Sequence, residues 1–340
     1  MLLSFLKLPY LAITTADRYF FKLFKFLVFK PKAKVVSIGN LSMGGTGKTP
    51  VLLELTRELA DKKLCVVSRG YRSPYEYSFY HLEGKGPHPE GLTDEALLFN
   101  RNFPEIPLLL GKRRDRSCRY AESRLNPELI LLDDGFQFRR LRKDIEIVLW
   151  DSLTKPKEAD LIPVGRLREP ISRLQDASAI LLTRCESASQ EQINFWMQWL
   201  KVKAPEVPVI KMKTICAGLF NKQGYNVTLD DIKGSFYAFS AIGRPESFLG
   251  QLQQMGISVK ESRHFRDHHR FTDNELIELQ KEAASKNLRL VCTEKDRVKI
   301  SDQMAQRMDL FTLGIRMVPE SDRKLTDELL KHGIQLDQQA

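Results

Sequence analysis

The sequence predicts an α/β fold, and two observations carry this prediction. Short apolar runs of strand length recur along the chain, and amphipathic helical stretches lie between several of them. A glycine-rich segment follows the first apolar run and precedes a predicted helix. Strands that alternate with helices form mostly parallel sheets covered on both faces. We therefore expect an α/β/α sandwich of P-loop NTPase type, with a second, smaller α/β lobe and an N-terminal amphipathic membrane helix.

The first element, residues 1–31, is rich in phenylalanine and basic residues. Six of the 19 phenylalanines lie in the first 30 residues. Arg18, Lys22 and Lys25 are spaced so that a helix places them on one face. The longest uncharged run, Leu8 to Ala16, is far shorter than the ~20 residues that a membrane span needs. We expect a helix in the membrane interface that Pro31 ends; the alternative is a helix packed on the protein's own core.

The next element is the glycine-rich segment. An apolar strand, Val35–Ile38, leads into the loop, and a helix is expected over Pro50–Asp61. Glycines let backbone N–H groups point at phosphates, a lysine reaches the outer phosphates, and a hydroxyl holds Mg²⁺. The loop departs from the commonest pattern, because Ser42 stands where glycine is common. The expected nucleotide-binding residues are Ser42, Met43, Gly44, Gly45, Thr46, Gly47, Lys48 and Thr49.

Further strands are expected at Leu64–Ser68, Pro107–Leu110, Leu129–Leu132, Ile145–Trp150 and Ala179–Leu182, and a further helix at Gln190–Lys201. The run Leu129–Leu132 is followed by Asp133 and Asp134, as a buried strand is when it supplies a metal-facing acid. Residues 73–92 contain many Gly, Pro, His and Tyr and are expected to form a long loop. The segment after it, which begins with Asp94, fits either a helix start or a chemical role.

The second half of the chain repeats the alternation. We expect a two-stranded linker from 207–220 and 309–318, which divides a P-loop domain, 32–206, from a smaller α/β domain, 221–308. Within the latter, a helix is expected over 294–307, and residues 319–340 form a tail or helix. A cleft between lobes is a common place for a ligand site.

Two polar segments remain. Residues 165–170 offer an arginine for phosphate charge and a carboxylate for a metal, or form a turn with an exposed ion pair. Residues 264–269 hold three of the six histidines. They fit a metal site, a surface turn, or a histidine tuned by Asp267 for proton transfer.

Composition restricts the partners. The net charge of +10 gathers in clusters that favour anionic ligands or acidic lipid. The five cysteines are scattered and form no C-x-x-C pair, which indicates a reducing compartment and argues against a zinc site.

A family resemblance rests on seven short motifs in order. The chain resembles the tetraacyldisaccharide 4′-kinase family of lipid A synthesis from about residue 1 to about residue 318. The motifs are Gly39-Asn40 with 44–50, Ser68 to Tyr71, Asp94-Glu95, Asp133 to Gln137, Leu167 to Pro170, Asp267 to His269 and Thr293 to Asp296.

This resemblance implies that the γ-phosphate of ATP is transferred to the 4′-hydroxyl of a tetraacylated glucosamine disaccharide 1-phosphate. It also implies Mg²⁺ and attachment to the cytoplasmic face of the bacterial inner membrane through the N-terminal helix. No nucleic-acid partner and no obligate protein partner are expected. By similarity, Lys48 would hold the β- and γ-phosphates and Arg168 would offset charge on the transferred group. The implied metal ligands are Thr49, an acid of the Asp133–Asp134 pair, and Glu169. Asp94, assisted by His268 from the second lobe, would take the hydroxyl proton.

Phe138 departs from the family pattern, because a histidine is common there. A membrane-attached P-loop ATPase of switch or positioning type is the main alternative. That class carries a lysine where this chain has Met43. A GTPase is disfavoured because the chain has no Asn-Lys-x-Asp motif, and a nucleic-acid-binding ATPase would leave the phenylalanine-rich N-terminus unexplained.

Overall fold

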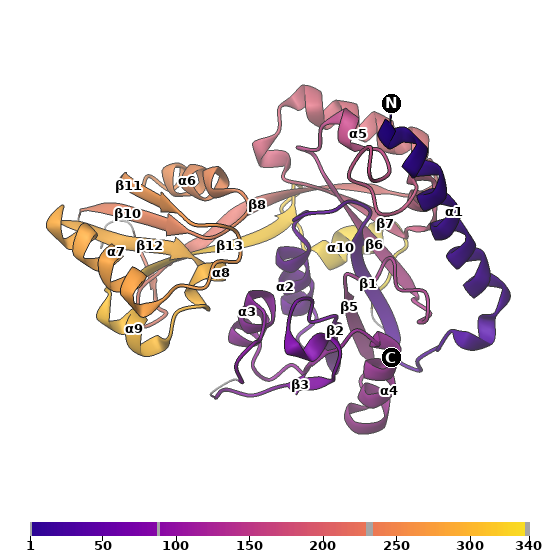
Figure 1. Cartoon of the computed structure of the whole chain (residues 1–340), viewed down its shortest axis with the longest axis horizontal. Helices are drawn as coiled ribbons and strands as arrows, with labels where there is room; N and C mark the ends of the chain where they lie inside the picture. The colour runs from indigo at the N-terminus through magenta and orange to yellow at the C-terminus, as the bar shows by residue number, and fades with distance from the viewer. Residues whose placement is uncertain (1, 87–88, 229–233, 337–340) are drawn as a thin grey trace. The chain divides into compact units, whose positions relative to one another are not determined.

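The computed structural model describes residues 2–86, 89–228 and 234–336 (Figure 1). It divides into two compact units. Unit 1 comprises Met1–Leu92, Phe103–Thr214 and Met317–Ala340, and unit 2 comprises Thr93–Asn102 and Ile215–Arg316. The chain passes from one unit into the other inside β8 (Val209–Phe220) and β13 (Phe311–Pro319), which are neighbours in the sheet. The expectation that these two extended segments pair is therefore confirmed.

The core of unit 1 is a mostly parallel sheet in the order β8-β7-β6-β1-β5-β2-β4-β3. Every neighbouring pair is parallel except the edge pair β3–β4. The central strands consist mostly of apolar residues because the sheet is covered on both faces. The strands are β1 (Lys34–Asn40), β2 (Leu64–Ser68), β3 (Tyr80–Leu82), β4 (Leu108–Leu110), β5 (Leu129–Asp133), β6 (Ile145–Asp151) and β7 (Ala179–Thr183).

Helices cover both faces of this sheet, which confirms the sandwich. On one face, α4 (Arg114–Tyr120) and α5 (Gln190–Lys203) pack on alternate residues of the strands. Trp196 of α5 packs against Trp150 of β6 there, with the two rings tilted by 56°. On the other face, α2 (Lys48–Glu58) packs on β1 and β5 and contacts α10 (Leu325–Lys331). Short helical turns lie at Pro74–Glu76, Ala121–Leu125, Pro156–Glu158, Ile171–Asp176 and Cys185–Ser187.

Unit 2 has a smaller parallel sheet in the order β11-β10-β12-β13, continued by β8 with β9 antiparallel to it. Its further strands are β9 (Asn226–Val227), β10 (Ser235–Ser240), β11 (Val259–His264) and β12 (Leu288–Thr293). Its helices are α3 (Asp94–Asn102), α6 (Pro245–Gln254), α7 (Asp273–Ser285), α8 (Glu294–Arg297) and α9 (Asp302–Arg307).

The segment that was expected to form a long loop, residues 73–92, belongs to unit 1 and contains the edge strand β3.

Two details of unit 2 differ from the sequence-based expectation. The single helix expected over 294–307 is two helices, because Ser301 caps a new helix by accepting a hydrogen bond from Met304 N. In addition, α3 was expected within the P-loop domain, 32–206, and the structure groups it with unit 2. The reason is packing: α3 lies against α8.

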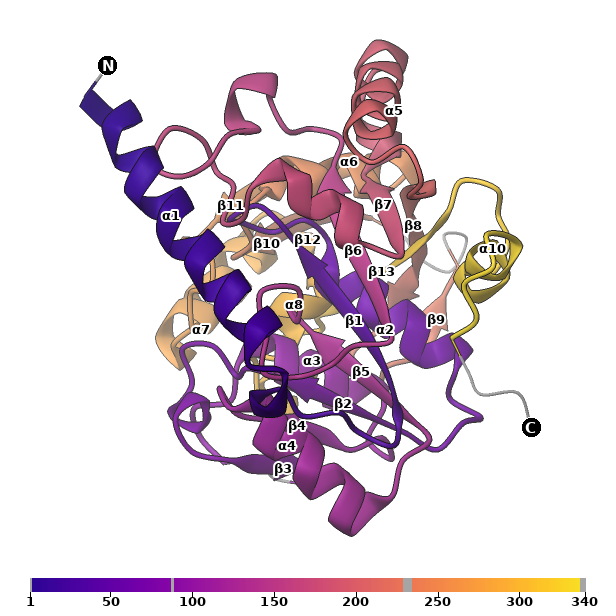
Figure 2. The ribbon, with the colours of Figure 1, turned by 90° about the vertical axis from the view of Figure 1, so that its right-hand side faces the viewer.

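The N-terminal helix α1 (Leu2–Leu23) runs along the outside of unit 1 (Figure 2). The expectation that it continues to Pro31 was wrong. A short turn, Lys25–Leu27, follows α1, and Phe29 then pairs with Leu141 through Phe29 N–Arg140 O (2.9 Å), which draws the backbone out of the helix.

One side of α1 contacts unit 1 and the other is exposed. Tyr10 Oη donates to Arg168 O (2.7 Å), and Arg18 forms an ion pair with Asp176 (3.4 Å). Arg18 therefore does not join Lys22 and Lys25 on a free basic face. The exposed apolar residues of α1 and the turn after it are Leu8, Ile13, Tyr19, Phe20, Leu23, Phe24, Phe26 and Leu27. Among the described residues, no helix is both long and apolar enough to span a membrane.

Candidate functional site

The glycine-rich loop joins the end of β1 to the start of α2. Gly44 and Gly47 have φ values of 105° and 92°, which a side chain would strain. A Cβ at Gly45 would meet no atom within 4 Å, so the space in front of the loop is open. Lys48 and Thr49 begin α2, whose N-terminal N–H groups favour an anion. The loop therefore has the shape of a phosphate cradle, as the sequence predicts.

Residues behind the loop hold it in this shape. Asn40 Nδ2 donates to Thr46 Oγ1 (2.9 Å), and Thr183 Oγ1 donates to Thr46 O (2.9 Å). Arg184 Nη2 donates to Gly45 O (2.7 Å). Thr46 is buried, so it shapes the loop from within. Sequence reasoning named Asn40 only as part of a motif and missed Thr183 and Arg184, which lie far from the loop in the chain.

Ser42 and Met43 form the entry to the loop. Ser42 forms an isolated antiparallel β-bridge with Leu167, and Met43 N donates to Arg166 O (2.8 Å). Arg166 Nη2 in turn donates to Met43 O (3.1 Å). These contacts bring the segment of residues 165–170 beside the phosphate loop, which its position in the sequence could not indicate.

The two acids after β5 have different partners. Asp133 lies opposite Ile38 of β1, so the end of β5 is beside the loop, and its Oδ2 accepts from Ser68 Oγ (2.8 Å). Asp134 adopts a left-handed conformation (φ 47°), which Asp tolerates better than most residues. Its Oδ1 pairs with Lys48 Nζ (3.4 Å) and with Arg168 Nη2 (3.1 Å). Burial opposes the charged form, but the nearby cations outweigh it and hold the pKa of Asp134 well below its ordinary value.

The neighbouring side chains of Arg168 and Glu169 have different partners, and only Arg168 contacts Asp134. Arg168 Nη2 also donates to Asn40 Oδ1, which accepts from Lys48 Nζ (3.3 Å) as well. Arg168 Nε is buried and has no hydrogen-bond partner among the described residues. Glu169 is buried and pairs with Arg139 (2.7 Å) and Arg173 (3.8 Å). In this structure Glu169 is therefore neutralised by two arginines rather than gathered with the acids after β5.

The residues proposed to take a proton meet inside unit 2. His268 Nδ1 lies 3.0 Å from Asp94 Oδ2, across a sequence separation of 174 residues. The side chain of Asp94 is 8% exposed and that of His268 is 47% exposed. His268 has a φ of 63°, and its N–H donates to Ala241 O (3.2 Å). The third alternative for the histidine cluster was a histidine tuned by the adjacent Asp267, and the structure instead places the imidazole within hydrogen-bond distance of a different carboxylate. The acid that pairs with it is Asp94, while Asp267 Oδ2 lies 3.8 Å from Nε2.

Two lysines that sequence reasoning did not single out also face Asp94. Lys295 Nζ lies 3.4 Å from Asp94 Oδ2, and Lys299 Nζ lies 3.9 Å from it. Burial would raise the pKa of Asp94, but Lys295, His268 and Lys299 together hold it below its ordinary value. Lys295 lies in α8 and Lys299 lies beyond its end, so no helical spacing in the sequence indicates this arrangement.

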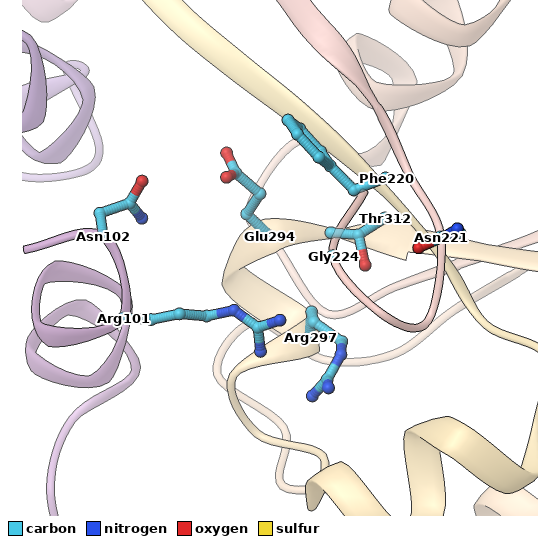
Figure 3. Close-up of a pocket in the computed structure, with 8 residues that line it drawn as sticks. All are labelled: Arg101, Asn102, Phe220, Asn221, Gly224, Glu294, Arg297 and Thr312. Carbon is cyan, nitrogen blue, oxygen red and sulfur yellow. The ribbon is translucent and has the colours of Figure 1, made fainter. Parts of the chain in front are cut away.

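A cavity of about 190 Å³ in unit 2 contains none of the expected site residues (Figure 3). Arg101 of α3 and Arg297 of α8 both reach it. Burial and the charge of Arg297 lower the pKa of Arg101. Arg297 Nη2 donates to Asp302 (2.6 Å), and Glu294 accepts from Ile315 N (3.1 Å). The charged groups here are satisfied by each other and by the backbone, which is typical of a structural cluster.

The donor set of unit 1 suits a magnesium nucleotide. No group of three or more His, Cys, Asp or Glu that could hold a metal occurs in the described parts of the chain. Mg²⁺ in nucleotide sites is held by one or two carboxylates together with phosphates and water, so a large protein cluster is not required. The carboxylates of Asp133 and Asp134 and the hydroxyl of Thr49 are suitable ligands for such a metal. The open loop leaves room for phosphates, and the unpartnered Arg168 Nε offers them a donor.

These features define the class of protein. A parallel α/β/α sandwich, a glycine loop between β1 and α2, and an acid at the end of the neighbouring strand β5 are the parts of a P-loop phosphotransferase or NTPase.

Comparison with known proteins narrows the class. A family model described as "Tetraacyldisaccharide-1-P 4'-kinase" matches residues 1–334. A tetraacyldisaccharide 4′-kinase of Halothermothrix orenii is 32% identical over 315 residues, covering 84% of this chain and 80% of the relative. One from Bdellovibrio bacteriovorus is 32% identical over 321 residues, covering 88% of each chain. The crystal structure of "apo" form LpxK from Aquifex aeolicus in complex with ATP has a TM-score of 0.75 at 27% identity and covers 97% of both chains.

The chain belongs to the tetraacyldisaccharide-1-P 4′-kinase family. It is a kinase of lipid A biosynthesis that uses ATP, and the resemblance seen in the sequence is confirmed. The alternative of a switch or positioning ATPase without a lipid substrate is not favoured.

Proposed function

We propose that unit 1 supplies the ATP-binding half of the reaction and unit 2 supplies the half that activates the acceptor hydroxyl. The acceptor is the 4′-hydroxyl of a tetraacylated glucosamine disaccharide 1-phosphate. The observation that carries this assignment is the Asp94–His268 pair at 3.0 Å, formed within a family whose reaction requires loss of a hydroxyl proton.

In unit 1, the N–H groups of the loop bind the phosphates, and Lys48 contacts the outer ones. Arg168 is proposed to stabilise charge on the transferred phosphoryl group, because its Nε is buried without a described partner and its Nη2 already lies beside Lys48 through Asn40. Thr49 and Asp133 are the proposed ligands of Mg²⁺. Asp134 would orient the side chains of Lys48 and Arg168, with which it forms ion pairs. Bound Mg²⁺ would offset the negative charge of the β- and γ-phosphates.

Glu169 is proposed to act through its arginines. Its carboxylate bridges Arg139 and Arg173, and it directly follows Arg168 in the chain. This fixes the backbone from which Arg168 extends. A direct contact of Glu169 with the metal would require these ion pairs to rearrange.

Label transfer tests the proposed roles. The protein is incubated with γ-labelled ATP, Mg²⁺ and the acylated disaccharide 1-phosphate, with DNA and with no acceptor as controls. Asp94→Ala should lower kcat about 10²- to 10⁴-fold while the Kd for ATP stays within about threefold of wild type. Asp61→Ala, a change to an exposed acid of unit 1, is the matched control and should keep full activity. Equal loss of ATP affinity in Asp94→Ala would make Asp94 a nucleotide residue instead.

We also propose that α1 attaches the protein to the cytoplasmic face of the bacterial inner membrane. The exposed residues Leu8, Tyr19 and Leu23 lie near one another on the helical wheel, and Phe20 and Phe26 extend the apolar surface. Such a surface fits the boundary between lipid headgroups and acyl chains. The side of α1 that contacts unit 1 carries polar links, so the helix has separate protein-facing and exposed sides.

Vesicle sedimentation tests the attachment. Phe20→Ser, Leu23→Ser and Phe26→Ser combined should release the protein from vesicles that contain anionic lipid. A matched variant replaces Val202 and Tyr225 by Ser, because these residues are also apolar and largely exposed but lie outside α1. The proposal fails if both variants sediment with vesicles as the wild type does.

A further inference from the structure

The entry to the phosphate loop runs antiparallel to residues 166–168. Met43 N donates to Arg166 O (2.8 Å), and Arg168 N donates to Leu41 O (2.7 Å). These two backbone hydrogen bonds lie on either side of the bridge between the two segments. They fix the backbone of residues 166–168 directly against the loop.

The side chains of this extended segment alternate between two faces. Leu167 is 1% exposed and packs in an apolar core of unit 1. Successive side chains of an extended segment point to opposite faces, so Arg166 and Arg168 both project from the face opposite Leu167. From that face, Arg168 reaches Asn40 and Asp134. The alternation therefore presents a second arginine to the same site.

The guanidinium group of Arg166 lies against the first half of the loop. Its Nη2 donates to Met43 O (3.1 Å), and a Cβ built on Gly44 would come within 2.5 Å of the same nitrogen. The side chain is 49% exposed, and Nη1 lies 3.9 Å from Glu158 Oε2, which is beyond hydrogen-bond distance. A guanidinium group has five N–H donors, so these contacts engage only part of the set.

The loop beside Arg166 has room for phosphates. A Cβ at Gly45 would meet no atom within 4 Å. Lys48, at the other end of the loop, shares Asn40 Oδ1 with Arg168. Cations therefore stand at both ends of the loop, and Arg166 is the one beside its glycines.

We propose that Arg166 is a further phosphate-binding residue, which contacts the γ-phosphate of ATP together with Lys48 and Arg168. This inference deepens the proposed function of unit 1 and rests on it. In phosphoryl transfer, negative charge is spread over three oxygens of the moving group, and a guanidinium group binds such oxygens with its planar fork of donors. The hydrogen bond to Met43 O holds Arg166 at the loop before the nucleotide arrives, which reduces the ordering that binding must impose.

Nucleotide binding tests the assignment. Arg166→Gln should raise the Kd for a non-hydrolysable ATP analogue about tenfold, because a charged hydrogen bond is lost. The Kd for ADP should stay within about twofold of wild type, because ADP has no γ-phosphate. Arg263→Gln removes an arginine that pairs with Glu278 and Glu282 in unit 2, and it should change neither Kd.

The two nucleotides separate phosphate binding from a role in shaping the loop. An equal loss of affinity for the ATP analogue and for ADP would mean that Arg166 only holds the loop in shape. Unchanged affinity for both would mean that Arg166 makes no phosphate contact. Either result would overturn the proposal. The Tm of nucleotide-free Arg166→Gln should match that of wild type, because the side chain is half exposed.

Steady-state kinetics give a second readout. At saturating ATP, Arg166→Gln should lower kcat about 10- to 100-fold, and Arg166→Lys, which keeps the charge without the fork, should retain intermediate activity. The KM for the acylated disaccharide 1-phosphate should stay at the wild-type value. A rise in that KM with unchanged affinity for the ATP analogue would place Arg166 at the phosphate of the acceptor and refute the assignment. Nucleotide binding needs no acceptor, whereas label transfer by the wild type tests the proposed function, so the two can fail independently.

Discussion

At the scale of single residues, Asn40 is the contact point of the ATP-binding half. Its amide nitrogen holds Thr46, while its amide oxygen accepts from both Lys48 and Arg168. Because an amide has a donor end and an acceptor end, the one side chain can both fix the shape of the loop and position Lys48 and Arg168.

Replacement of Asn40 should weaken ATP binding, because Asn40 supports the loop and its cations. Asn40→Ala leaves Thr46 Oγ1 and the two cations without this partner. We expect the KM for ATP to rise about tenfold, which corresponds to about 1.4 kcal/mol, the value of one good hydrogen bond. Steady-state kinetics with varied ATP measure this. A KM equal to that of wild type would show that Lys48 and Arg168 are placed without Asn40.

Asp134 should make stability depend on pH. Its folded-state pKa is lowered, so its contribution is complete above the unfolded value of about 3.9 and is lost as pH falls through the folded value. At pH 7, Asp134→Asn leaves Lys48 and Arg168 without their anion and should lower the free energy of unfolding by about 1–3 kcal/mol. Urea unfolding should show the gap to wild type narrowing below about pH 4. A gap that is constant with pH would contradict the assignment.

At the scale of elements, α10 depends on a side chain from another helix. Glu58 of α2 accepts from Leu325 N and Thr326 N, both at 2.8 Å. A carboxylate at this position satisfies two N–H groups of the first turn and interacts favourably with the helix dipole.

Loss of this cap should loosen α10 alone. Glu58→Ala should lower the free energy of unfolding by about 1–2 kcal/mol and expose the α10 segment to limited proteolysis. Glu58→Gln keeps one acceptor and should have a smaller effect. If protease cleavage around residues 325–331 were unchanged in Glu58→Ala, the cap would not be what holds α10 in place.

Elements with strong local signals were predictable. Strands β5 and β7 are apolar runs that end in one polar residue, and a capping box of Ser189 and Gln192 marks the start of α5. Their positions therefore follow from local pattern. The end of α1 was not predictable, because the edge pairing of Phe29 with Leu141 decides it. The split between α8 and α9 depends on a cap at Ser301 inside a sequence that would otherwise suit one helix.

At the scale of the whole molecule, the residues proposed to take part in the reaction are divided between the two units. The motifs in the sequence named these candidate residues but did not predict their contacts. Lys295 and Lys299 face an acid some 200 positions away in the chain, and no local pattern reports such a meeting. Arg184, in the left-handed region, was missed for the same reason.

The net charge of +10 and the exposed apolar face of α1 should act together on a membrane. Electrostatic attraction to anionic lipid is screened by salt, with a Debye length of about 3 Å at 1 M, whereas apolar insertion is not. We expect vesicle binding to weaken in 0.5 M NaCl without vanishing. Sedimentation at rising salt measures this; complete release would mean that charge alone carries the attachment.

The hydrogen bond from Tyr10 to the carbonyl of Arg168 has a mechanical consequence. This hydrogen bond connects α1, which carries the exposed apolar face, to the backbone of Arg168, the residue proposed to stabilise the transferred phosphoryl group. A shift of α1 on contact with lipid would have to be absorbed at that carbonyl, either by breaking the bond or by moving the arginine. If α1 attaches the protein to lipid as proposed, the turnover of the enzyme in solution should therefore differ from its turnover on a bilayer.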